Sequence, residues 1–156
     1  MIVANQIKTR LMEEIHLYPA DLQQPLELPF AEEGIRAGFP SPAQDFIGES
    51  IDLNRDLINH AESTFYARAV GDSLKDANVY EGDILVVDKS LEPRDGDMAV
   101  CCVDGDFTLK FIEKHPDYLL LRPANAAYKP IKVLPDDYFM VWGIVTYVIH
   151  KVRHRK

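Results

Sequence analysis

Hydrophobic and polar positions divide the chain into an irregular first part and a strand-rich remainder. Beyond residue 63, short runs of β-branched and aromatic residues alternate with turn residues, a pattern typical of β-strands. Runs of this number and spacing predict a mainly β protein with a compact, twisted, antiparallel β domain. The six predicted strands span residues 64–70, 84–87, 98–103, 107–112, 118–121 and 138–149.

One hairpin is predicted in detail. The strands at residues 98–103 and 107–112 are joined through Asp104 and Gly105. An Asp-Gly pair readily adopts the two positive φ angles that a two-residue type I′ turn requires. These two strands are therefore expected to be antiparallel neighbours.

A short helix is predicted before the β domain. In residues 52–60, Asp52 is placed as an N-cap, and Leu53, Leu57 and Ile58 are spaced to face inward. A chain of 156 residues is short for two full domains. We therefore expect one domain preceded by an arm.

The first part of the chain is predicted as that arm. Residues 7–15 fit a short amphipathic helix, whereas residues 18–42 lack sustained periodicity. Because proline has no backbone N–H, the prolines of this stretch are expected to deny it regular hydrogen bonding and to leave it extended. They are Pro19, Pro25, Pro29, Pro40 and Pro42.

Charge excludes one broad class of function. The formal net charge of -8 argues against an extended nucleic-acid groove, because phosphate contacts need clustered Lys and Arg. The basic tail at residues 150–156 fits a solvated chain end better than a DNA contact. A protein partner or a self-contained activity is favoured, and no specific DNA binding is expected.

The sequence predicts a cytoplasmic protein. No run approaches the roughly 18 apolar residues that cross a bilayer, and residues 1–6 lack a signal-peptide pattern. Cys101 and Cys102 are adjacent in a predicted strand, so they point to opposite faces and make a poor disulfide pair. We expect both to be free thiols in a reducing compartment.

Ser73 follows a predicted strand and precedes a short polar turn. Its spacing from Asp76 resembles a capping box, in which Ser73 would cap a helix and have no chemical role. A serine at such a turn would also have two backbone N–H groups, its own and that of Asp72, directed to where an oxyanion could lie. Local spacing by itself favours the cap.

Lys110 lies among apolar residues on the strand predicted at residues 107–112. Alternation places it on one face with Thr108 and Ile112. One explanation is an edge strand whose lysine reaches water. The other is a buried lysine, since burial favours the neutral amine, which can accept the proton of a serine hydroxyl.

Ala37 and Gly38 form a bond between two small residues in the predicted arm. Such a bond can fit a protease cleft. An Ala-Gly pair is also common in flexible linkers, so the bond alone does not separate the two explanations.

Seven ordered segments identify a resemblance. They are AGFPSPA (37–43), IDLN (51–54), GDS (71–73), EGDILVVD (81–88), DGD (95–97), DGDFTLK (104–110) and PANAAYKPI (123–131). With these segments the chain, from residue 18 to its end, resembles the LexA/UmuD group of self-cleaving serine peptidases, and its UmuD branch most of all.

The resemblance implies a set of site residues. Ser73 would be the nucleophile and Lys110 the general base of a serine-lysine dyad that cuts the bond between Ala37 and Gly38. The backbone N–H groups of Asp72 and Ser73 would bind the oxyanion. Such a dyad needs no metal ion and no cofactor, and we expect neither.

The resemblance also implies domains and partners. Residues 1–37 would be an arm removed by self-cleavage, and residues 38–156 a LexA/signal-peptidase-like β domain with a linker to about residue 62. A RecA-DNA filament would stimulate the cut in the SOS response. The protein would form homodimers, and after cleavage the shortened form would be an accessory subunit of a UmuC-like translesion DNA polymerase in error-prone repair.

Three departures from the family pattern remove no reacting group. Leu74 stands where the family often has Met, Phe111 where it often has a basic residue, and Ala37 where the UmuD branch often has Cys. LexA repressors carry a DNA-binding domain before the cut, so the short segment before Gly38 favours the UmuD branch. The alternatives are a non-cleaving interaction module, a truncated LexA-type repressor, and a signal peptidase, which would need a membrane anchor.

Overall fold

The computed structural model describes residues 15–19, 27–29 and 50–153. The helix predicted at residues 7–15 lies outside this part of the chain except for Ile15, which begins a strand. The bond between Ala37 and Gly38 also lies outside it. Within the described residues, no helix is long and apolar enough to cross a membrane.

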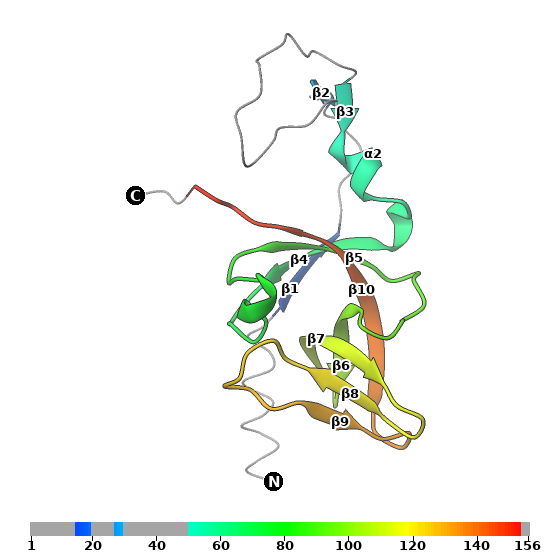
Figure 1. Cartoon of the computed structure of the whole chain (residues 1–156). Coiled ribbons are helices and arrows are strands. Elements are labelled where there is room, and N and C mark those ends of the chain that lie inside the picture. The colour runs from blue at the N-terminus through cyan, green and yellow to red at the C-terminus, as the bar shows by residue number, and fades with distance from the viewer. Residues whose placement is uncertain (1–14, 20–26, 30–49, 154–156) are drawn as a thin grey trace.

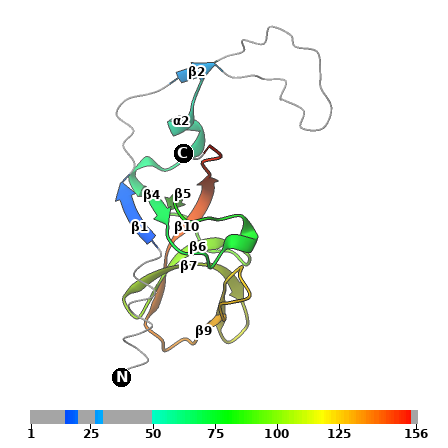
Figure 2. The same cartoon turned by 90° about the vertical axis from the view of Figure 1, so that its left-hand side faces the viewer.

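Eight antiparallel strands form the main sheet in the order β1-β4-β5-β10-β6-β7-β8-β9, which confirms the predicted mainly β, antiparallel fold. A second sheet pairs β2 with β3, and it lies with helix α2 beyond one end of the main sheet (Figures 1 and 2). The strands are β1 (Ile15–Pro19), β2 (Glu27–Pro29), β3 (Ser50–Asp52), β4 (Thr64–Ala69), β5 (Ile84–Asp88), β6 (Met98–Val103), β7 (Asp106–Lys114), β8 (Leu119–Arg122), β9 (Ile131–Val133) and β10 (Phe139–Ile149). The helices are α2 (Leu53–Leu57) and the single 3-10 turns η1 (Ala61–Ser63) and η2 (Lys75–Ala77).

Strand β10 joins the two halves of the main sheet (Figure 1). Its residues 139–144 pair with β6, and its residues 144–149 pair with β5. The register shifts once on each side, between Val141 and Gly143 and between Val145 and Tyr147. Such bulges bend a strand and increase its twist, which lets one strand serve both halves of a curved sheet.

All six predicted strands are present, as β4 to β8 and β10, with ends that differ from the prediction by at most two residues. The predicted hairpin turn is confirmed, because Asp104 and Gly105 have φ angles of 50° and 86°. Val103 and Asp106 are cross-strand partners on either side of this turn. Strand β9 was not predicted, since three residues are too few to show a period.

The prediction that prolines exclude regular pairing from the arm is wrong at two places. Pro19 ends strand β1, which pairs with β4, and Pro29 ends strand β2, which pairs with β3. A proline at the end of a strand interrupts few ladder hydrogen bonds, because it lacks only its own N–H. The partner strands lie far along the chain, so local sequence did not reveal them.

The helix predicted at residues 52–60 is shorter than expected. Asp52 is its N-cap as predicted, and its carboxylate accepts a hydrogen bond from the backbone N–H of Asn54 at 3.0 Å. The helix ends at Leu57, and the chain is extended at Ile58. Leu53 is 52% exposed instead of facing inward, whereas Ile58 is buried. A helix of five residues is too short to present a continuous apolar face.

Two clusters of buried apolar side chains form the core. In the first, Leu85 and Val87 pack with Val100 and Leu109, and Trp142 covers them with its ring 5.2 Å from that of Phe65. The second cluster contains Ala99, Cys101, Ile112, Leu121, Val133 and Ile144. Strands β6 and β7 contribute to both clusters, so residues on β7 are packed on both faces.

Asp88 on β5 forms hydrogen bonds that hold the segment just before β4. Its buried carboxylate contacts His60 Nδ1 at 2.6 Å and accepts hydrogen bonds from the hydroxyls of Ser63 and Ser90 at 3.2 and 2.7 Å. Burial raises the pKa of this carboxyl, but the hydrogen bonds from Ser90, His60 and Ser63 outweigh burial and hold the pKa below its ordinary value. The charged form is therefore the one that stabilises the fold.

Replacing Asp88 by asparagine is expected to lower the free energy of unfolding by about 2 kcal/mol at pH 7. Because the folded pKa is depressed, the carboxylate's contribution is present above the unfolded pKa of about 4 and is lost as the pH falls through the folded value. Urea unfolding of both chains at pH 7 and pH 3 measures this contribution. The difference in unfolding free energy between the parent and the variant should be smaller at pH 3. The exposed Asp136→Asn is the control. If the two chains were equally stable at pH 7, or if their difference in stability grew in acid, the Asp88 carboxylate would not stabilise the fold in this way.

Candidate active site

Ser73 lies in the loop between β4 and η2, with 6% of its surface exposed. The loop is held by backbone hydrogen bonds from Ala124 N–H to the Ser73 carbonyl at 2.8 Å and from Lys75 N–H to the Asp72 carbonyl at 3.2 Å. Ala124 follows strand β8, so a distant part of the chain fixes this loop. The backbone around Ser73 is therefore anchored on both sides of the serine.

The helix-cap explanation for Ser73 is wrong. The residue at the N-cap of η2 is Leu74, and it makes no side-chain capping hydrogen bond. The backbone N–H of Asp76, which a capping box would satisfy with the serine hydroxyl, donates instead to the Ala124 carbonyl at 2.8 Å. The Ser73 hydroxyl is thus not used to begin a helix.

The edge-strand explanation for Lys110 is also wrong. Strand β7 lies between β6 and β8, and Lys110 is only 3% exposed. Its Nζ lies 3.2 Å from Ser73 Oγ, 2.8 Å from Thr108 Oγ1 and 3.1 Å from the Leu109 carbonyl oxygen. The fold brings Lys110 and Ser73, which are 37 residues apart, into hydrogen-bond contact.

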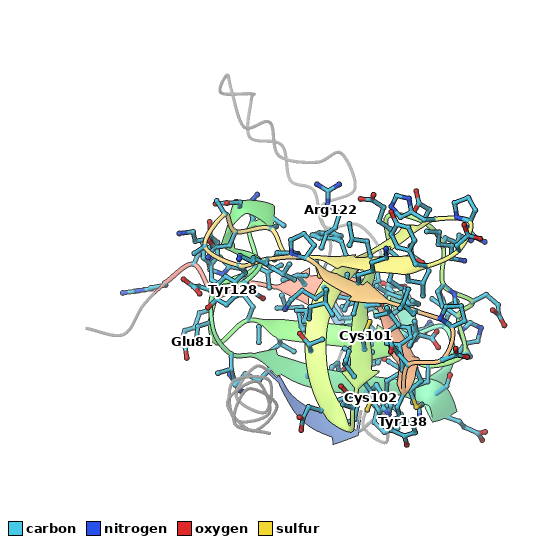
Figure 3. The ribbon with its side chains drawn as sticks, turned by 90° about the horizontal axis from the view of Figure 1, so that it is seen from below. Glu81, Cys101, Cys102, Arg122, Tyr128 and Tyr138 are labelled. Atoms are coloured by element: carbon cyan, nitrogen blue, oxygen red, sulfur yellow. The ribbon has the colours of Figure 1, made fainter. Side chains whose placement is uncertain are left out.

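Buried residues surround Lys110 on the neighbouring strand. Its cross-strand partner Ala99 is fully buried, and Cys101, opposite Thr108, is fully buried as well. Burial raises the pKa of the Cys101 thiol to about 12, although the positive charge of Lys110 acts in the opposite direction. Both cysteines are free thiols, as predicted, and Figure 3 shows Cys101 in the middle of the molecule. A site in such a place excludes most water.

The two backbone N–H groups expected to bind an oxyanion belong to Asp72 and Ser73, in the loop that follows β4. Among the described residues, no backbone carbonyl accepts a hydrogen bond from the N–H of Asp72 or of Ser73. An oxyanion site requires backbone N–H groups that can donate to the developing negative charge. Their role stays a prediction, because the carbonyl that would use them belongs to Ala37, outside the described residues.

Asn125 and Tyr128 are two site neighbours that the sequence did not single out. Asn125 is 6% exposed, and its Nδ2 donates a hydrogen bond to the Asp72 carbonyl at 2.8 Å. The Tyr128 hydroxyl donates to Asp72 Oδ1 at 2.7 Å, and Figure 3 shows Tyr128 at the periphery of the molecule. Their only sequence signal was their place in the matching segment at residues 123–131.

Replacing Asn125 by alanine is expected to slow self-cleavage by roughly tenfold or more. The loss of a buried side-chain hydrogen bond costs about 1 to 3 kcal/mol, and here it would release the backbone of Asp72 beside Ser73. The rate of fragment formation at pH 10 measures the effect, with thermal unfolding as a check of the fold. The exposed Asn59→Ala serves as control. Cleavage by the Asn125 variant at the parent rate would contradict a positioning role.

No metal site accompanies this arrangement within the described residues. Among them, no group of three or more His, Cys, Asp and Glu side chains is placed to hold an ion. The site contains a hydroxyl group and an amine in contact, and both residues are buried. That pair can perform nucleophilic attack with proton transfer.

Comparison with known proteins places the chain in a family. The family model described as Peptidase S24-like matches residues 29–146. The chain is 40% identical to Protein SamA of Salmonella typhimurium over 88% of this chain and 96% of that protein. It is 38% identical to Protein ImpA of Escherichia coli over 80% of this chain and 85% of that protein.

The length of a LexA repressor distinguishes the LexA branch of the family from the UmuD branch. The chain is 32% identical to the LexA repressor of Sorangium cellulosum over 76% of this chain, but over only 52% of that repressor. SamA and ImpA, in contrast, are matched over most of their own length. The family predicted from the seven sequence segments is confirmed, and the chain belongs to the peptidase S24-like family as a UmuD-like member.

Proposed function

We propose that this protein is a self-cleaving regulator that cuts its own bond between Ala37 and Gly38 with Ser73 and Lys110. The observation that carries the proposal is the contact of 3.2 Å between Lys110 Nζ and Ser73 Oγ in a buried, apolar place. A lysine is costly to bury, and an apolar residue of similar size would stabilise the core at least as well, so stability alone does not explain a lysine at this position. Membership of a serine peptidase family supplies the reaction class.

The reaction proceeds in two halves. Neutral Lys110 takes the hydroxyl proton of Ser73 as its Oγ attacks the carbonyl carbon of Ala37, and the N–H groups of Asp72 and Ser73 stabilise the oxyanion. The bond to Gly38 breaks as the lysine gives the proton to the departing amine. Water then hydrolyses the ester on Ser73, which restores the serine and leaves a carboxylate on Ala37.

Tethering explains how two residues suffice. A substrate on the same chain reaches a high effective concentration, so a weakly activated dyad can still turn over once. In this scheme residues 1–37 are the removable arm, and residues 38–156 are the β domain, with a linker to about residue 62. How often the arm occupies the site then sets the rate.

The biological role that best fits the relatives is UmuD-type SOS mutagenesis. In that role a RecA-DNA filament favours the cleavable arrangement in the cytoplasm. The shortened form, as a homodimer, serves a UmuC-like translesion DNA polymerase in error-prone repair. These partners enter through the family and not through any contact in this chain.

The direct test is incubation of the pure chain between pH 7 and pH 10, with the fragments identified by mass. Fragments that end at Ala37 and begin at Gly38, and that form faster as the pH rises, are expected because only a neutral amine can accept the serine proton. A folded chain that stays intact at pH 10, and also with a RecA-DNA filament, would favour a non-cleaving interaction module. Tight DNA binding at low salt would favour a LexA-type repressor instead.

Mixing variants distinguishes cleavage within a chain from cleavage across a dimer. Ser73→Ala subunits are mixed with subunits whose Gly38 is replaced by proline to block the cut. Product from this mixture requires that one subunit cut the other. Absence of product, once the two variants have been shown to form mixed dimers, assigns the reaction to a single chain.

A further inference from the structure

Strand β1 belongs to the arm by sequence but to the main sheet by structure. Its residues Ile15–Pro19 precede the proposed cut, yet they pair antiparallel with β4 over five residue pairs. In Figures 1 and 2, β1 lies beside β4 in both views, at the edge of the main sheet. Cutting after residue 37 would therefore sever the outermost strand of the sheet from the rest of the protein.

Strand β4 has little protection without β1. It pairs with β5 along its other edge, from Thr64 to Arg68. It contains no proline or glycine, and Arg68 is its one charged residue. Proteins usually guard such an edge with prolines, several charges, bulges or a covering segment. Here the covering segment is β1, so its departure leaves a regular six-residue edge ready to pair with another strand.

Tethering decides how firmly β1 stays in place. While residues 20–63 connect β1 to β4 without a break, the effective concentration of β1 at β4 is on the order of millimolar. After the cut that advantage disappears, and the released fragment is then held only by two short pairings, five residue pairs between β1 and β4 and three between β2 and β3. At the dilute concentrations of a regulatory protein the strand would dissociate.

We propose that the edge of β4 is a docking site for an extended peptide strand, and that its occupant is the segment Ile15–Pro19 of this chain. Cleavage converts this segment from a fixed strand of the sheet into a dissociable ligand. Cleavage would then expose the backbone N–H and C=O groups of β4 that had been paired with β1. The docking itself does not depend on self-cleavage, whereas the release step rests on the function proposed above.

The pairing is tested in the uncut chain by a disulfide. His16 and Arg68 are cross-strand partners, and Cα atoms of antiparallel partners are close enough for a disulfide. In a chain with Ser73→Ala and Cys102→Ser, the pair His16→Cys and Arg68→Cys should form an intramolecular disulfide on mild oxidation. The off-register pair His16→Cys and Tyr66→Cys is the matched control. Equal cross-linking of the two pairs would overturn the register.

The release is tested with a cut that does not use the dyad. The recognition sequence of an external protease is inserted after Glu33 in the full chain carrying Ser73→Ala. A fluorescent peptide of residues 11–23 is then added before and after the external cut. Its anisotropy should report binding at least about tenfold tighter to the cut chain, because the tethered strand excludes it beforehand.

A control peptide checks that strand pairing is responsible. Successive N–H groups of a strand point to opposite sides, so replacing both His16 and Leu17 by proline removes at least one ladder hydrogen bond in either register. This peptide should not bind the cut chain. Equal binding of the parent peptide to cut and uncut chains, or to neither, would overturn the proposal. A cut chain that doubles its mass and excludes the peptide would show that a second copy, and not residues 15–19, takes the edge.

Because the external protease makes the cut, these outcomes are independent of the dyad. A chain that fails to cleave itself at pH 10 but binds the peptide after the external cut retains the docking site and loses the proposed function. A chain that cleaves itself but never binds the peptide retains the function and loses the docking site.

Discussion

Replacing Lys110 by methionine is expected to abolish self-cleavage while leaving the chain folded. Methionine has a similar length and fills the same buried space, but it cannot accept the proton of Ser73. Loss of one member of a nucleophile-base pair typically lowers the rate by at least about a thousandfold. Fragment masses after incubation at pH 10 measure the loss, and thermal unfolding checks that the variant is still folded, because its buried methionine leaves the former partners of the amine without that hydrogen bond.

Matched variants separate the dyad from general effects of lysine and serine replacement. Ser73→Ala should be as inactive as Lys110→Met, and the double variant no worse, because the two residues act as one unit. Lys114→Met on the same strand removes a lysine that bonds the exposed carbonyl of Pro93, so it should cleave normally. Ser63→Ala should also cleave normally. Cutting at the parent rate by either dyad variant would disprove the mechanism.

A methyl group at Gly143 is expected to destabilise the fold more than any surface change. Gly143 is buried at the bulge of β10, and a Cβ built there would lie 2.6 Å from Val87 Cγ1 and 3.4 Å from the Asp88 carbonyl oxygen. The first distance is too short for two carbon atoms, so Val87 or the strand must move. Gly143→Ala should therefore cost about 2 to 3 kcal/mol of unfolding free energy, and Gly143→Val more.

Urea unfolding of the Gly143 variants measures this cost. The control is Gly96→Ala, at a turn where φ is +87° and no atom lies within 4 Å of the added Cβ. That variant carries backbone strain without a clash, and its expected cost is roughly 1 kcal/mol. If Gly143→Ala unfolded at the same urea concentration as the parent, close packing of β10 against β5 would be disproved.

The contact between Ser73 and Lys110 and the bulge at Gly143 both depend on strand β10 and its neighbours. Strand β10 pairs with both β5 and β6, and β6 in turn pairs with β7, which carries Lys110. The loop with Ser73 is held from the other side by Ala124 and Asn125, after β8. The contact between Lys110 and Ser73 therefore depends on strands from most of the domain.

The sequence by itself determined the elements whose cause is local. The Asp104-Gly105 turn was predictable because only a few residue pairs adopt two positive φ angles readily. The Asp52 cap was predictable because its carboxylate satisfies an N–H two residues away. The long strands were predictable because β-branched residues recur over many positions. The family was determined by ordered segments that no local rule explains.

Only the tertiary structure decided the features whose partners are distant. It formed strands β1 and β2, which end at Pro19 and Pro29, because strands far along the chain supply their hydrogen-bond partners. It placed Lys110 inside the sheet instead of at an edge, since strand order follows from global packing and not from alternation. It brought the amine of Lys110 to the hydroxyl of Ser73 across 37 residues of sequence. Local patterns report the period of a segment, whereas a site is made by contacts between segments, and those are fixed only when the whole sheet closes on its core.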